Sequence, residues 1–281
     1  MNSPQKKIII TAGDPAGIGL DLCVKLAYKK FPANITVVGN LNALKKRAQF
    51  YKKKITTKKN LSNHEGNGNL NFINISYAKN VVPGEIEPKN SIAQLSGLKF
   101  AAKECLENNF DALVTLPINK KVLNSSTLNF KGHTEFISEI CNTLGDEIML
   151  LTNKDLKVAL VTTHIALKKV PKVITKKILR KKIQILNSQL ISKFSIKNPR
   201  ITVTGLNPHA GENGEFGDEE IKIITPTIEK LKAEGLNLIG PIPADTAFTE
   251  KNLANADCFL AMYHDQGLSA FKALSFGKGI N

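Results

Sequence analysis

Short apolar runs rich in β-branched residues alternate with longer segments of helical periodicity along the whole 281-residue chain. Such runs are typical of buried strands, and the segments between them are typical of helices that cover a sheet. The alternation therefore predicts an α/β fold with mostly parallel strands. The expected strands are residues 7–11, 35–39, 70–75, 112–115, 148–151, 157–162, 201–204 and 257–262.

Helices are expected over residues 19–30, from 41 onwards, and over 91–108, 133–144 and 218–233, with a long one after Pro171. The long helix carries Leu179, Ile183, Leu186 and Leu190 on one stripe, which predicts the face that packs on a sheet. The length allows one large domain or two medium ones. From two connections that contain Pro or Gly we predict two α/β/α domains: residues 1–127 plus 241–281, and residues 128–240.

Charge and composition leave few partner classes open. The net charge is +15, and residues 45–59 hold eight Lys or Arg and no acidic residue. This run matches no nucleic-acid-binding motif, so we favour a solvated basic face and an anionic small substrate over nucleic acid. No apolar run is long enough for a membrane span, and the start of the chain does not resemble a signal peptide. Together with four cysteines that lack metal-binding spacing, this predicts a cytoplasmic protein with buried free thiols.

Three of the five histidines stand at or just after the end of a predicted strand. His164 follows the strand 157–162, His209 lies in the Gly-rich loop after 201–204, and His264 follows 257–262. Ligands in α/β proteins bind beyond the carboxyl ends of strands. Three neutral imidazoles around an open position make a catalytic metal site, so convergence of these residues would predict one. His64, in a polar Gly/Asn-rich stretch, is expected to be solvated.

Two predicted helix starts suit an anion. Residues 12–19 turn from the first strand into a helix, but their glycines at 13, 17 and 19 do not form the dinucleotide fingerprint. At the second start, His133 and Thr134 stand beside the N–H groups that a helix leaves unpaired, which suits a phosphate or a carboxylate. The alternatives are a plain strand-to-helix turn at the first position and a simple cap at the second.

Several segments, in order, resemble those of the 4-hydroxythreonine-4-phosphate dehydrogenase family, which serves pyridoxal phosphate biosynthesis. The resemblance spans nearly the whole chain. The segments are Thr-Ala-Gly-Asp-Pro-Ala-Gly-Ile-Gly at 11–19, Gly-His-Thr-Glu-Phe at 132–136, Thr-Thr-His at 162–164, Gly-Leu-Asn-Pro-His-Ala-Gly-Glu at 205–212, Pro-Ala-Asp-Thr at 243–246 and Ala-Met-Tyr-His-Asp-Gln-Gly at 261–267.

The resemblance implies a two-domain fold like that of isocitrate and isopropylmalate dehydrogenases, with the active site in the interdomain cleft of a homodimer. It implies NAD-dependent oxidation and decarboxylation of 4-phosphooxy-L-threonine to 3-amino-2-oxopropyl phosphate. The NAD-contacting residues remain unassigned. It implies that His164, His209 and His264 ligate a divalent metal (zinc, magnesium or cobalt) shared between subunits, with His264 supplied by the partner. It further implies catalytic roles for Asp245 and Lys272, and substrate binding by His133, Thr134, Lys272 and Asn281.

Two departures from the family pattern stand out. Leu20-Asp21 replaces the usual Pro-Glu, and the family's C-terminal segment is expected to continue beyond Asn281. Three alternatives therefore stay open: a paralogue acting on a four-carbon aldonate phosphate, a truncated and inactive ligand-binding remnant, and a basic nucleic-acid binder.

Overall fold

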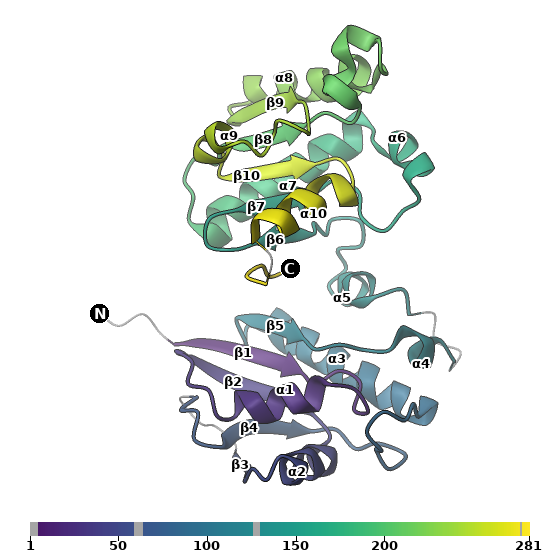
Figure 1. The fold of residues 1–281 in the computed structure, drawn as a ribbon, viewed down its shortest axis with the longest axis vertical. Coiled ribbons are helices and arrows are strands. Elements are labelled where there is room, and N and C mark those ends of the chain that lie inside the picture. Colours follow the sequence, from purple (N-terminus) through teal and green to yellow (C-terminus); the bar gives the residue numbers. More distant parts are fainter. Residues whose placement is uncertain (1–4, 59–63, 126–129, 276) are drawn as a thin grey trace. The chain divides into compact units, whose positions relative to one another are not determined.

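The computed structural model describes residues 5–58, 64–125, 130–275 and 277–281, and it divides into two compact units, Met1–Gly145 and Asp146–Asn281. The first unit is built on a parallel sheet of order β3-β4-β2-β1-β5 (Figure 1). Its elements are β1 (Lys6–Thr11), α1 (Gly19–Leu26), β2 (Ala33–Gly39), α2 (Leu41–Phe50), β3 (Thr56–Lys58), β4 (Asn69–Asn74), a 3₁₀ turn (Pro88–Asn90), α3 (Ser91–Leu106), β5 (Ala112–Thr115), α4 (Lys120–Ser125) and α5 (His133–Ile140).

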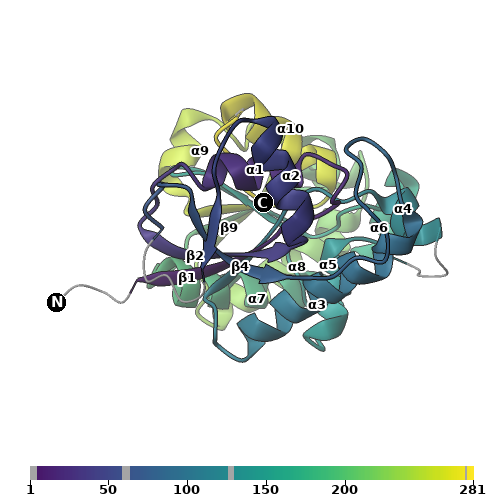
Figure 2. The ribbon, with the colours of Figure 1, turned by 90° about the horizontal axis from the view of Figure 1, so that it is seen from below.

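The alternating side chains of β1 and β2 supply both faces of the first sheet. Ile10 and Val37 pack in the core formed with α1 and α2, whereas Ile9 and Val38 pack with Ala101 of α3 on the other face. Successive residues of a strand point to opposite faces, so a continuous apolar run can be covered on both sides. Figure 2 shows α1 and α2 on one side of these strands and α3 on the other.

The second unit has a sheet of order β6-β7-β10-β8-β9, in which only β6 runs antiparallel to its neighbour. Its elements are β6 (Leu150–Thr152), β7 (Lys157–Leu160), a 3₁₀ turn (Leu167–Lys169), α6 (Val170–Val173), α7 (Lys176–Phe194), β8 (Ile201–Thr204), a turn (Pro208–Gly214), a π-helical turn (Glu220–Ile224), α8 (Thr225–Ala233), β9 (Leu238–Ile242), α9 (Glu250–Asn255), β10 (Cys258–Ala261) and α10 (His264–Ser275).

Two helical layers cover the second sheet (Figure 1). The stripe on α7 is buried as predicted and packs against Ile201, Val203 and Leu260. On the opposite face, Leu268 and Phe271 of α10 belong to the core that contains Val158, Leu160 and Phe259. Within the described residues no helix is both long and apolar enough to cross a membrane.

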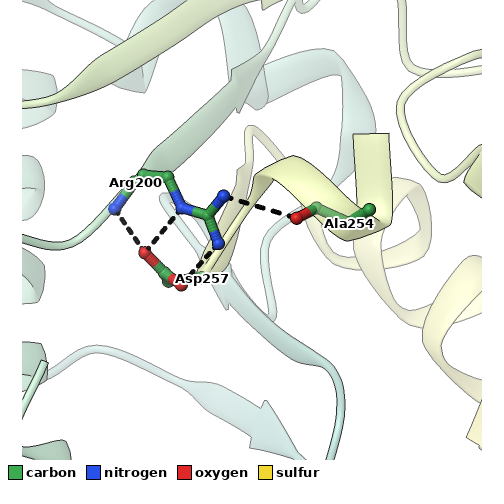
Figure 3. Close-up of polar contacts among 3 residues, drawn as sticks. All are labelled: Arg200, Ala254 and Asp257. Atoms are coloured by element: carbon green, nitrogen blue, oxygen red, sulfur yellow. Dashed lines mark hydrogen bonds and ion pairs between the residues drawn. The ribbon is translucent and has the colours of Figure 1, made fainter. Parts of the chain in front are cut away.

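Arg200 and Asp257 directly precede β8 and β10, and hydrogen bonds between them join the starts of the two strands (Figure 3). The guanidinium donates from Nε to Oδ2 of Asp257 at 3.1 Å and from Nη2 to Oδ1 at 3.0 Å, and Nη1 donates to the carbonyl of Ala254 at 3.3 Å. A two-pronged pair of this kind fixes geometry as well as charge. It therefore helps to set the register of the two strands whose other ends carry His209 and His264.

All eight predicted strands are present, with ends that shift by a few residues. The structure adds β3, which has only three residues, and β9, which contains Gly240 and Pro241 and was not among the predicted strands. The domain boundaries need correction. Residues 258–261 form the middle strand of the second sheet, so the segment 241–281 belongs to the second unit and does not return to the first.

His64 also differs from the prediction, because it is buried and its Nε2 lies 2.8 Å from the carbonyl oxygen of Leu26. The ring thereby anchors the end of α1 and is not solvated. All four cysteines are free. Cys23 and Cys258 are buried, and burial raises the pKa of each thiol to about 12, whereas Cys105 and Cys141 are only partly buried.

Candidate functional site

Four neighbouring strands of the second sheet present their carboxyl ends at one edge. Strands β7, β10, β8 and β9 are adjacent and mutually parallel, so the residues that follow them emerge on the same side. Those residues include His164 after β7, His264 after β10, His209 after β8 and Asp245 after β9. The topology therefore gathers, at the edge where α/β proteins bind ligands, four side chains that can bind a metal or move a proton.

His164 and His264 are brought together within one chain, with ring centroids 5.4 Å apart. The register explains this, because Ala261 pairs with Leu160 and the Thr162 hydroxyl donates to the Met262 carbonyl at 2.7 Å. The two chain segments thus leave the sheet at the same level, and their imidazoles lie side by side. The two rings therefore lie close together within one chain, and the supply of His264 to the metal by a partner subunit stays a prediction.

The imidazole of His264 has one nitrogen engaged. Its Nδ1 lies 2.7 Å from Oδ1 of Asp265, and the ring is partly exposed. A carboxylate on one ring nitrogen is the usual partner of a metal-binding histidine, because it fixes the orientation of the ring and leaves the other nitrogen for the ion. The donor set at this edge therefore fits a divalent metal.

His209 stands apart from the pair. Leu260 of β10 pairs with Val203 of β8. His264 comes four residues after Leu260, whereas His209 comes six residues after Val203, so the two histidines do not leave the sheet at the same level. The ring of His209 is exposed and lies 5.8 Å from that of Phe216. In the part of the chain that the structure describes, no three His, Cys, Asp or Glu side chains form a group that could hold a metal. One chain therefore assembles two of the three predicted ligands.

The backbone around His209 is left-handed over five consecutive residues, from His209 (φ 52°, ψ 27°) to Asn213 (φ 56°, ψ 23°). A left-handed conformation costs about 1–2 kcal/mol for each residue that has a Cβ. Such strain persists only where surrounding contacts enforce it, and it clusters at functional sites. The conformation of this loop is therefore imposed by its neighbours, and residue types alone did not reveal it.

Gln266 joins the two strand ends that carry His209 and His264. Its Oε1 accepts from the Met262 N–H at 2.7 Å and from the Thr204 hydroxyl at 2.8 Å, and its Nε2 donates to the Gly205 carbonyl at 2.8 Å. Gln266 therefore holds the start of α10 against the end of β8. The sequence analysis assigned no role to this residue, although it lies two positions after His264 in the family-like segment 261–267.

The other predicted residues of this unit are exposed. Oδ1 of Asp245 accepts from the Thr246 N–H at 3.0 Å, which leaves Oδ2 available. Lys272 lies on α10, and Asn281 follows Ile280, whose backbone pairs with Thr152 of β6. Within the described residues no hydrogen bond or ion pair joins any of these three side chains to the histidine pair.

The first unit contains the remaining predicted residues, His133 and Thr134, at the start of α5. Among the described residues no side chain forms a capping hydrogen bond at Gly132, so the first N–H groups of this helix have no cap there. The pKa of His133 is lowered because the ring is partly buried and because Lys120 is nearby. His133 thus favours its neutral form. It lines a hollow with Tyr77 and Gln94, whose buried Oε1 has no hydrogen-bond partner among the described residues.

The loop after β1 is held by a residue of α2. Arg47 donates from Nη2 to the carbonyls of Ala16 at 3.2 Å and Gly17 at 3.1 Å, and its Nη1 lies 3.4 Å from Oδ1 of Asp21. Both side chains of the ion pair are largely buried. The acid at position 21, which departs from the family pattern by one methylene, therefore still has a cationic partner.

Comparisons with known proteins show which family the chain resembles. The family described as pyridoxal phosphate biosynthetic protein PdxA matches residues 32–281. A 4-hydroxythreonine-4-phosphate dehydrogenase of Ectopseudomonas mendocina (strain ymp) is 43% identical over 99% of this chain and 83% of its own length. One of Methylococcus capsulatus is 41% identical over 98% of this chain and 84% of its own length.

Solved structures show the same relationship. The crystal structure of 4-hydroxythreonine-4-phosphate dehydrogenase from Klebsiella pneumoniae superposes with a TM-score of 0.88 at 31% identity. That match covers 98% of this chain and 87% of the Klebsiella chain. The two-unit α/β fold, the matched profile and the identity to these relatives lead to one conclusion: the chain belongs to the PdxA family of pyridoxal phosphate biosynthetic proteins.

Proposed function

We propose that the chain is an NAD-dependent and divalent-metal-dependent dehydrogenase that oxidises and decarboxylates 4-phosphooxy-L-threonine to 3-amino-2-oxopropyl phosphate. The observation that carries the proposal is the pair of imidazoles, His164 and His264, at the carboxyl edge of the second sheet, with His209 on the adjacent strand end. The names of the relatives support the substrate and its place in pyridoxal phosphate biosynthesis. The free thiols support a reducing, cytoplasmic setting.

His164, His209 and His264 would hold the metal, and imidazole ligands suit zinc and cobalt better than magnesium. A divalent ion at such a site acidifies a coordinated hydroxyl and stabilises negative charge on oxygen. Bound NAD would supply the hydride acceptor. The glycines of the loop after β1 lack the dinucleotide fingerprint, and two of its carbonyls already accept hydrogen bonds from Arg47, so we assign no residue to NAD.

The remaining residues of the proposal bind the substrate or move its proton. His133 and Thr134, with the uncapped start of α5, would bind the phosphate through N–H and O–H donors. Lys272 would pair with the substrate carboxylate, and Asn281 would bind the substrate as well. Asp245, whose Oδ2 is available, would accept the hydroxyl proton.

A homodimer with a shared site is part of the proposal, because one chain assembles two of the three imidazoles. Mixing two inactive variants tests this directly. If the third ligand crosses the two-fold axis, His164→Ala and His209→Ala subunits restore one intact site in each mixed dimer, or about a quarter of wild-type activity at statistical exchange. Mixed dimers without activity would contradict a site in which His209 crosses between subunits.

The substrate is tested by NADH formation with 4-phosphooxy-L-threonine and, in parallel, with four-carbon aldonate phosphates. The proposal predicts turnover of the threonine derivative with metal present, and far slower turnover of the sugar acids. A preference for a sugar acid would identify a paralogue with the same metal and hydride chemistry. A chain that turns over none of these substrates would contradict the proposed activity.

A further inference from the structure

One buried carboxylate holds the loop that carries His209. Glu220 stands in the π-helical turn before α8 and is 2% exposed. Its Oε1 accepts from the backbone N–H groups of Leu206 at 2.6 Å and Asn207 at 2.9 Å. Its Oε2 accepts from Nδ2 of Asn207 at 2.8 Å. Three donors on two consecutive residues therefore converge on one side chain across the base of the loop.

The loop is shaped to admit this carboxylate. A Cβ on Gly205 would lie 2.9 Å from Oε1 of Glu220, and one on Gly211 would lie 2.7 Å from Oε2. Both approaches are shorter than a side chain tolerates, so two glycines clear the space that the carboxylate occupies. Gly211 also has φ of +82°, a conformation that a residue with a Cβ rarely adopts. The glycine content of this loop, which the sequence suggested would let a ligand approach, thus serves in part to seat Glu220.

The anchor lies at the start of the left-handed run. Only Pro208 separates Leu206 and Asn207 from His209, and the Ala210 N–H donates to the Asn207 carbonyl at 3.1 Å. Because Glu220 binds both the backbone and the side chain of Asn207, the position from which the left-handed run begins is fixed. A buried carboxylate pays a desolvation cost that only such a full set of donors offsets.

We propose that Glu220 is the positioning residue that presents His209 to the metal, an inference that rests on the proposed function. Glu220 touches neither substrate nor ion; it acts through the backbone at Leu206 and Asn207. A purely structural role would make Glu220 matter for folding alone. A positioning role predicts in addition that its loss weakens metal binding in a protein that stays folded.

The experiment compares Glu220→Ala, Glu220→Gln, Glu219→Ala and His209→Ala in the full chain. Glu219 is the matched control, because it is the adjacent carboxylate and contacts the Asn207 side chain at 2.7 Å but no loop N–H. Two readouts are used: amide exchange rates at Leu206 and Asn207 in the metal-free protein, and affinity for Co²⁺ by calorimetric titration.

For Glu220→Ala we expect amide exchange at Leu206 and Asn207 to quicken and Co²⁺ affinity to fall by about tenfold or more, the usual effect of losing a residue that supports a metal ligand. Glu220→Gln keeps Oε1 but turns an amide nitrogen toward Asn207 Nδ2, so we expect a smaller loss of affinity. If Glu220→Ala does not fold, Glu220→Gln still allows amide exchange and Co²⁺ affinity to be measured. His209→Ala should lose Co²⁺ affinity with both amides still protected, and Glu219→Ala should resemble wild type.

Unchanged amide exchange in both Glu220 variants would overturn the inference, and so would faster exchange with unchanged Co²⁺ affinity. The two proposals fail differently. A wild-type chain that binds no Co²⁺ contradicts the metal site of the proposed function, and with it the role of Glu220 toward that metal. A wild-type chain that binds Co²⁺ independently of Glu220 contradicts the positioning role alone.

Discussion

Replacing Gln266 with alanine should destabilise the second unit markedly, although the side chain is small and polar. The substitution removes three hydrogen bonds and leaves three groups without partners: the Met262 N–H, the Thr204 hydroxyl and the Gly205 carbonyl. Met262 and Thr204 are both 0% exposed, so water does not replace the lost partner without local opening. A buried polar group left unsatisfied costs about 1–3 kcal/mol.

Summed over three groups, that range would reach several kcal/mol, but the Thr204 hydroxyl has a second, longer contact to the Leu260 carbonyl at 3.5 Å. We therefore expect a loss of about 2–4 kcal/mol in the free energy of unfolding. Urea denaturation of wild type, Gln266→Ala and Gln266→Glu measures it. Glutamate keeps the acceptor for Met262 and Thr204 but cannot donate to Gly205, and it turns a carboxylate oxygen toward that carbonyl, so we expect it to destabilise the unit as well.

The exposed control is Asn252→Ala, which removes one hydrogen bond to the Thr246 carbonyl and should change stability by less than about 1 kcal/mol. A loss below about 0.5 kcal/mol for Gln266→Ala would show that the three partners are satisfied without Gln266 and that its hydrogen bonds do not stabilise the unit.

Three further predictions follow from other parts of the structure. The hydrogen bonds from the Arg200 guanidinium hold the pKa of Asp257 below its usual range. The pair therefore stabilises the fold fully above the pKa of an unfolded aspartate, and this contribution is lost as pH falls through the lower folded pKa. In Asp257→Asn the denaturation midpoint should depend less on pH in the acid range than it does in wild type. Ile183→Ala, in the buried stripe of α7, should lower the free energy of unfolding by about 2–5 kcal/mol. A loss under about 1 kcal/mol would show that neighbouring side chains fill the cavity that the substitution leaves. The imidazole of His133 should titrate below 6.5 by NMR, and Lys120→Ala should raise its pKa; no rise would exclude Lys120 as a cause.

The sequence predicted strands and helices well wherever burial is two-sided or strictly periodic. The run at 201–204 matches β8 because all four residues are buried, and the stripe on α7 is fully confirmed. It failed at β9, because glycine and proline favour a loop and only pairing with β8 makes that segment a strand. It also failed at His64, where burial depends on Leu26, a residue distant in sequence.

For the candidate site, the sequence predicted which histidines follow strands but not which of them lie close together. Their proximity depends on the register between β7, β10 and β8, and the local sequence pattern does not specify that register. The domain boundary failed for a related reason, because β10 inserts between β7 and β8 although it comes last in the chain. The sequence did not reveal the supporting residues Gln266 and Glu220, because most of their partners are brought to them only by the fold: Glu220 contacts residues 13 and 14 positions away, and Gln266 contacts Gly205, 61 positions away.

We propose that three histidines form one metal site on which the dehydrogenase activity depends. NADH formation from 4-phosphooxy-L-threonine, measured at fixed NAD and Co²⁺, tests it most directly. We expect turnover in wild type and in the exposed control Lys168→Ala. We expect a loss of about tenfold or more in each of His164→Ala, His209→Ala and His264→Ala, and on chelation of the metal. Turnover that survives both chelation and loss of any one of these histidines would contradict it.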